Sequence, residues 1–222
     1  MCGLASVIFG KKRRRTEERE HLAWLFSRLL LSEERGPHAT GAAWLDTDGG
    51  HRLFKRPVTA ERFVTDKAFA ELLAGINNRA TLLLGHTRWR TRGDERVNSN
   101  NHPIRAGEVI GTHNGTIYNA DYLFRRWKMR RFAEVDSEIL FRLAANAARD
   151  GAMDIERFKA RLRRCRGSDH RRHRLPDRPG HRLCAQGEPA VGTALAFPPQ
   201  SRSLRFGPRI PRRRAGGGKR LA

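Results

Sequence analysis

Regular apolar patterns run through this chain only as far as about Cys165, and this limits what it can fold into. Before that point, short apolar runs typical of strands alternate with longer segments that carry apolar residues at helical spacing. Residues 168–222 show no sustained period and are dominated by Arg, Pro, Gly and Ala. We therefore expect one folded domain in residues 1–167 and an irregular basic tail in residues 168–222, either disordered or read in a shifted frame.

The patterns before Cys165 indicate a mixed α/β domain. The expected strands are residues 4–9, 41–45, 52–55, 81–85 and 108–112. The expected helices are residues 16–31, a helix capped by Thr65, residues 137–149 and a last helix capped by Asp154. In the tail, the apolar run at 195–197 is too short to anchor a core.

The net charge of +22 invites a nucleic-acid interpretation, but its distribution weakens that interpretation. Residues 157–222 hold 19 of the 45 basic residues and only 3 of the 23 acidic ones. This segment has few aromatic residues for base stacking, Phe197 and Phe206 among them. We expect contact with nucleic acid to be nonspecific and to run through the tail.

No metal site, disulfide framework or membrane segment is expected. The three cysteines, Cys2, Cys165 and Cys184, are widely spaced and include no CxxC pair. No run of about 18 apolar residues is present. The basic run 11–15 follows the first apolar run, the reverse of a secretory signal, so the expected address is the cytoplasm.

The start of the chain, Met1-Cys2-Gly3, offers a nucleophile. Removal of Met1 would place a thiol and a free α-amine on the same residue. An α-amine has a pKa of about 7.7–8.0, so part of it is unprotonated at neutral pH and can act as a base. Cys2 could then serve as nucleophile and base together. Many chains carry cysteine at position two, so this feature alone is weak.

Two further motifs follow predicted strands. Arg88 lies in Gly85-His86-Thr87-Arg88-Trp89-Arg90-Thr91, and its planar fork suits a carboxylate. Asn114 and Gly115 could supply an amide and a backbone N–H to an oxyanion hole. The plain alternatives are one surface arginine among many and an ordinary Asn-Gly turn.

Asp136 stands with Ser137 and Glu138 at the head of the expected helix 137–149. Either Asp136 or Ser137 could be a helix N-cap. Asp136 could also bind a cationic ammonium group, and both roles could hold at once.

Read in order, these motifs resemble the class II glutamine amidotransferases, an N-terminal nucleophile family, and most closely the glutaminase half of glucosamine-6-phosphate synthase. The resemblance covers residues 1–167. The segments that carry it are MCG at the start, RGPHATG at 35–41, GHTRWRTRG at 85–93, NNHP at 100–103, GTHNGTIYN at 111–119 and VDSE at 135–138. It implies an α+β fold, a four-layered αββα sandwich of the N-terminal nucleophile hydrolase type.

The resemblance also implies a reaction, the hydrolysis of L-glutamine to L-glutamate and ammonia through a Cys2 thioester, with no cofactor. Arg88 would bind the glutamine α-carboxylate and Asp136 the α-ammonium. Trp89 and Thr91 would line the pocket. Asn114 and Gly115 would form the oxyanion hole.

Some features depart from the family pattern. Arg92 stands where the glucosamine-type enzymes usually carry His, and Pro37-His38 replaces the more usual Tyr-Asp. No synthase domain follows, so a separate subunit could accept the ammonia, the chain could be a stand-alone glutaminase, or it could be truncated. The alternatives are a catalytically inactive relative and a basic protein that binds nucleic acid through its Arg-rich tail.

Overall fold

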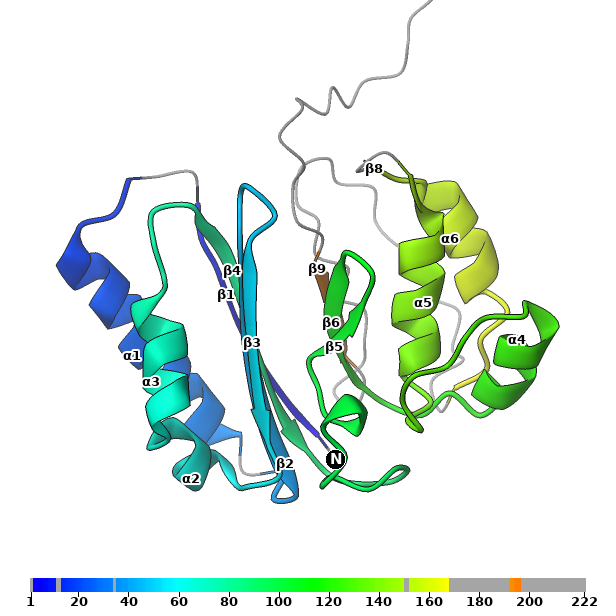
Figure 1. Ribbon diagram of the computed structural model, residues 1–222, viewed down its shortest axis with the longest axis horizontal. Coiled ribbons are helices and arrows are strands. Elements are labelled where there is room, and N and C mark those ends of the chain that lie inside the picture. The colour runs from blue at the N-terminus through cyan, green and yellow to red at the C-terminus, as the bar shows by residue number, and fades with distance from the viewer. Residues whose placement is uncertain (1, 11–12, 34, 150–151, 168–191, 197–222) are drawn as a thin grey trace, which may run out of the picture.

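The elements of the computed structural model form successive layers of helices, sheet, sheet and helices (Figure 1). The structure describes residues 2–10, 13–33, 35–149, 152–167 and 192–196. The arrangement is mixed α and β, as the sequence patterns indicate.

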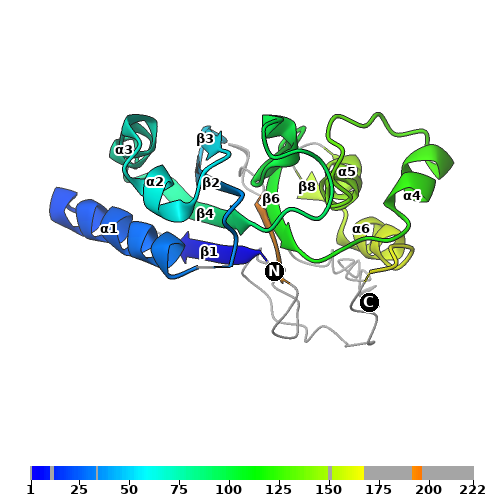
Figure 2. The same cartoon turned by 90° about the horizontal axis from the view of Figure 1, so that it is seen from below.

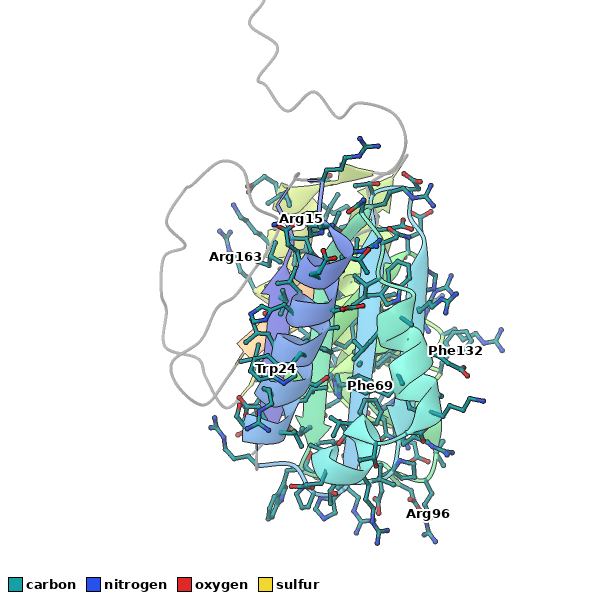
Figure 3. The ribbon with its side chains drawn as sticks, turned by 90° about the vertical axis from the view of Figure 1, so that its left-hand side faces the viewer. Arg15, Trp24, Phe69, Arg96, Phe132 and Arg163 are labelled. Atoms are coloured by element: carbon teal, nitrogen blue, oxygen red, sulfur yellow. The ribbon has the colours of Figure 1, made fainter. Side chains whose placement is uncertain are left out.

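The first sheet has four strands in the order β1-β4-β2-β3, and every neighbouring pair is antiparallel. Its strands are β1 (Gly3–Ile8), β2 (Ala39–Asp46), β3 (His51–Arg56) and β4 (Ala80–Arg88). Three helices cover its outer face: α1 (Thr16–Ser32), α2 (Ala60–Val64) and α3 (Lys67–Ala74). Figure 3 looks onto this helical layer, with Phe69 of α3 and Trp24 of α1 labelled.

The second sheet has the order β5-β6-β9, again antiparallel. Its strands are β5 (Ile104–Ala106), β6 (Val109–Asn114) and β9 (Gly192–Ala196). The helices beyond it are α4 (Ala120–Arg126), α5 (Glu138–Ala147) and α6 (Ile155–Leu162). The remaining elements are a two-stranded ribbon of β7 (Ala148–Arg149) and β8 (Ala152–Met153), and a 3-10 turn at Asn98–Asn100.

Three apolar clusters hold the layers together. One lies between α1–α3 and the first sheet and includes Phe26 and Leu83; another lies between the second sheet and α4–α6 and includes Phe141. The third lies between the sheets and consists of Ala43, Leu45, Leu82, Leu84 and Ile110, with Leu53 packed against it.

The alternation of β4 explains where this inter-sheet core ends. Successive side chains of a strand point to opposite faces, so Leu82, Leu84, His86 and Arg88 share the face turned toward the second sheet. The first two belong to the inter-sheet core, whereas the last two are polar and buried. The apolar interior therefore gives way to polar side chains at the end of β4.

One helix cap and two short helices differ from the expectation. Thr65 does not cap α3, because the side chain of Asp66 accepts the hydrogen bond from Ala68 N–H. Helices α2 and α4 were not predicted, since each is too short for a clear helical period. The cap of α6 is confirmed, because the Asp154 side chain accepts from Arg157 N–H.

Residues 192–196 lie in the segment expected to be irregular, yet they form β9 and pair with β6. Such a short run becomes a strand through its partner, which its own sequence cannot reveal. The other expectations for residues 168–222, disorder or a shifted frame, fall outside the described residues. Within the described ranges, no helix combines the length and the apolar character needed to cross a bilayer.

Candidate active site

Three strand ends bring the candidate residues together. In the antiparallel register of β1 and β4, Gly3 lies opposite Thr87, so Cys2 comes next to Arg88. Strand β6 ends at Asn114, whose side chain accepts a hydrogen bond from Cys2 N across the gap between the sheets. Figure 2 looks onto this end of the molecule, where the N-terminus lies between β1 and β6.

Cys2 is half-buried, and both hydrogen-bond contacts of its sulfur are with the backbone of Trp89. Its Sγ accepts from Trp89 N–H at 3.3 Å and lies 3.6 Å from Trp89 O, to which the thiol can donate. Burial raises the pKa of the Cys2 thiol, and the Trp89 N–H and the nearby Arg88 guanidinium partly counter this. Residue 1 precedes Cys2, so the Cys2 nitrogen in this structure is a peptide nitrogen.

Asn114 and Gly115 follow one another at the end of β6, where the Asn114 side chain contacts Cys2. The Oδ1 of Asn114 accepts from Cys2 N at 3.2 Å, which leaves its Nδ2 amide as a donor. Gly115 has a φ of +153°, a backbone conformation that glycine adopts more readily than other residues. The hydrogen bond therefore places the Asn114 side chain, one of the two groups expected from the sequence, beside the Cys2 nitrogen.

Arg88 also lies near Cys2, but its guanidinium already donates hydrogen bonds to other residues of this protein. It is 3% exposed, and its Nη1 donates to Asn101 Oδ1 at 2.8 Å. Its Nη2 donates to the carbonyls of Arg92 and Gly93 at 2.5 and 2.8 Å. Both two-pronged edges of a guanidinium include Nη2. A carboxylate gripped by two hydrogen bonds would therefore displace one of these carbonyls.

The carbonyls come from the loop 89–97, which follows β4 and carries Trp89, Thr91 and Arg92. Trp89 is 48% exposed and Thr91 is also exposed. The Arg92 side chain forms an ion pair with Asp121 of α4 at 3.0 Å. Arg92 therefore does not add its charge to the space beside Cys2.

Asp136 is 5% exposed, and its Oδ2 accepts the hydrogen bond from Ile117 N–H. Its charge acts on the pKa values of Cys2, Arg88 and His113, so it lies within electrostatic range of all three. The N-cap role is not supported for its neighbour, because Ser137 makes no capping hydrogen bond through its side chain and instead pairs with His113 Nδ1 at 2.8 Å.

Three buried histidines lie behind the site. The rings of His86 and His102 stack with centroids 4.4 Å apart, and His86 Nε2 lies 3.3 Å from His113 O. Burial lowers the pKa of His86 to about 3 and that of His113 to about 4, and it lowers the pKa of His102 as well. All three are therefore neutral near pH 7.

No role was expected from the sequence for these histidines, for Asn101 or for His38. Asn101 and His102 fall in the NNHP segment, so the motif marked their place without showing which side chains they meet. Within the described ranges, no cluster of three or more histidine, cysteine, aspartate or glutamate side chains could hold a metal ion.

Comparison with known proteins places the chain beside enzymes that use glutamine. It is 31% identical over 172 residues to a glutamine–fructose-6-phosphate aminotransferase of Bradyrhizobium diazoefficiens, and 38% identical over 171 residues to that of Caulobacter vibrioides. Each match covers 76% of this chain and 26% of the relative. The enzyme of Geobacillus kaustophilus is 31% identical over 140 residues, 61% of this chain and 22% of the relative. The chain thus spans about a quarter of the length of these relatives.

A solved structure supports the fold. The glutamine phosphoribosylpyrophosphate amidotransferase of B. subtilis matches with a TM-score of 0.51 and 19% identity. The match covers 75% of this chain and 33% of that one. No family model matches the chain.

Proposed function

The chain carries a class II glutamine amidotransferase domain, and from this we propose that it hydrolyses L-glutamine to L-glutamate and ammonia. The observation that carries the proposal is the pair of contacts at Cys2. Its sulfur lies against the Trp89 peptide, and its nitrogen is bound to Asn114 Oδ1. One residue thus presents a nucleophile and a nitrogen beside an oxyanion donor.

The chemistry requires removal of Met1, which turns the Cys2 nitrogen into a free amine. That amine takes the thiol proton, and the sulfur attacks the side-chain carbonyl carbon of glutamine. The Nδ2 of Asn114 and the N–H of Gly115 bind the oxygen that becomes negative. The amine then returns the proton to the leaving nitrogen, and ammonia departs from a thioester.

Water completes the cycle. The Cys2 amine accepts a proton from water as it attacks the thioester carbon, and the same two donors stabilise the second tetrahedral intermediate. Collapse of this intermediate returns the proton to sulfur and releases glutamate. The sum is glutamine plus water giving glutamate plus ammonia, and none of these steps calls for a cofactor.

Glutamine would be held at its two charged ends. Arg88 binds the α-carboxylate, after one of the loop carbonyls on its Nη2 has moved away. Asp136 binds the α-ammonium with the carboxylate oxygen that Ile117 N–H leaves free. Trp89 and Thr91 form the wall of the pocket on the side of the loop 89–97.

We assign the fold to the αββα sandwich of N-terminal nucleophile hydrolases, because its layers follow that order. We assign the glutaminase domain to residues 1–167. For the ammonia that is released, we propose a separate synthase subunit as the acceptor. A reducing cytoplasm would keep the Cys2 thiol free.

Glutamate formation from glutamine tests the proposal. Wild-type protein whose mass shows that Met1 is absent should produce glutamate and ammonia in equal amounts. Cys2→Ser should lose the activity, and asparagine should be a poor substrate for both proteins. Equal rates for the wild type and Cys2→Ser would refute the assignment of the nucleophile.

A further inference from the structure

His38 contacts the chain on both sides of Trp89, the residue that holds the candidate nucleophile. Its backbone N–H donates to Arg88 O at 3.1 Å, and its side-chain Nδ1 accepts from Arg90 N–H at 3.1 Å. Its ring also meets the Trp89 ring edge-on, with centroids 5.5 Å apart and an interplanar angle of 84°. One residue therefore fixes the chain before Trp89, after it and at its side chain.

Trp89 is the residue whose peptide groups contact the Cys2 sulfur. Trp89 N–H donates to Cys2 Sγ at 3.3 Å, and Trp89 O lies 3.6 Å from it. Trp89 O belongs to the same peptide unit as the N–H that His38 Nδ1 binds. Rotation of that unit would therefore move both the carbonyl near the thiol and the hydrogen bond to His38.

The hydrogen bond also defines the form of the histidine. A backbone N–H can only donate, so Nδ1 must carry the lone pair and the ring proton must be on Nε2. What the position requires is a hydrogen-bond acceptor one bond beyond Cγ.

We propose that His38 is a positioning residue for the Cys2 thiolate. Its Nδ1 holds the Trp89–Arg90 peptide, and its backbone N–H holds Arg88 O, so that Trp89 N–H stays directed at Sγ. A thiolate gains more from this donor than a thiol does, because hydrogen bonds to charged acceptors are the stronger ones. The inference rests on the proposed role of Cys2 as nucleophile.

Substitutions at His38 separate the acceptor from the ring. His38→Leu removes the acceptor, and His38→Asn keeps one, since Asn Oδ1 occupies the place of Nδ1. His38→Gln moves the acceptor one bond outward. The matched control is His21→Leu, which removes another histidine in ring contact with a tryptophan, in this case stacked on Trp24 of α1 with centroids 5.6 Å apart.

The readout is the rate at which iodoacetamide alkylates Cys2 in the full chain, followed by peptide mass from pH 6 to 10. We expect His38→Leu and His38→Gln to shift the midpoint of this profile upward by about one pH unit and to slow labelling near pH 7 about tenfold. His38→Asn and His21→Leu should follow the wild type. If His38→Leu does not fold, the comparison of His38→Asn with His38→Gln decides whether the position of the acceptor matters.

A wild-type profile for His38→Leu, or identical profiles for the Asn and Gln variants, would overturn the inference. The test is independent of glutamine turnover. Normal alkylation of Cys2 together with no glutaminase activity would therefore count against the proposed function. The inference about His38 would still be decided by the alkylation profiles of its variants. A loss of unfolding stability with an unshifted pH profile would show that His38 serves the fold alone.

Discussion

Asp136→Asn is expected to weaken glutamine use by removing the charge that faces the α-ammonium. The carboxylate is 5% exposed and one of its oxygens accepts from Ile117 N–H, so the other is left for the substrate. In the variant, the amide oxygen can keep the bond to Ile117. The NH₂ group then points at the ammonium, a donor facing a donor.

The size of the effect follows from the burial of Asp136. Leaving a buried charged group without its partner costs about 2–4 kcal/mol, which is a fall of about 30- to 900-fold in kcat/KM at 1.36 kcal/mol per factor of ten. The fall should be in KM more than in kcat, because the ammonium is remote from the reacting amide. The exposed cap of α6 supplies the control, since Asp154→Asn keeps its bond to Arg157 N–H and should behave as the wild type.

The assay measures ammonia release from glutamine and from 4-carbamoylbutanoate, which is glutamine without its α-amino group. In the wild type, kcat/KM for glutamine should exceed kcat/KM for 4-carbamoylbutanoate by about the factor by which Asp136→Asn lowers kcat/KM for glutamine. The variant should show little difference between the two substrates. If Asp136→Asn still discriminates between the two substrates as strongly as the wild type, Asp136 does not bind the ammonium and the reasoning is refuted.

Three other predictions concern the oxyanion donors, the buried histidines and the packing beneath β4. Asn114→Ala should lower kcat about 10²–10³-fold with little change in KM, and a normal kcat would exclude an oxyanion role. The pKa values of His86 and His113, about 3 and about 4, lie below the value of about 6.5 for an unfolded histidine. The unfolded state therefore binds more protons below pH 6.5, so the urea midpoint should fall from pH 7.5 to pH 5, and a constant midpoint would contradict this. Gly36→Ala would place a Cβ 2.2 Å from a backbone carbon of β4 and should lower stability by about 1–3 kcal/mol, whereas Gly10→Ala meets nothing within 4 Å and should not.

The strands were largely predictable because their apolar runs are long enough to show. Strand β4 was predicted to end at Gly85, yet it continues through Arg88. Its last residues are polar, and a polar residue in a strand pattern normally indicates a surface. Here both side chains are buried, His86 against His113 of β6 and Arg88 against the segment that follows β4. Such burial depends on tertiary packing and not on the strand's own sequence.

The sequence grouped the candidate residues but did not predict their contacts. Cys2, Arg88 and Asn114 stand at strand ends, so motif order was enough to group them. The engagement of Arg88 by loop carbonyls depends on how the chain folds back at Gly93, whose φ is +77°. The ion pair of Arg92 depends on α4, a helix too short to be predicted.

The central claim is that Cys2 is a nucleophile in a glutamine pocket, and one mass spectrum tests it most directly. The purified protein is incubated with 6-diazo-5-oxonorleucine, an electrophile shaped like glutamine, and its intact and peptide masses are recorded with and without glutamine. We predict a chain without Met1 that carries a single adduct on Cys2, and glutamine should suppress that adduct. A folded chain that lacks Met1 and gains no adduct, or one labelled equally in the presence of excess glutamine, would contradict the claim.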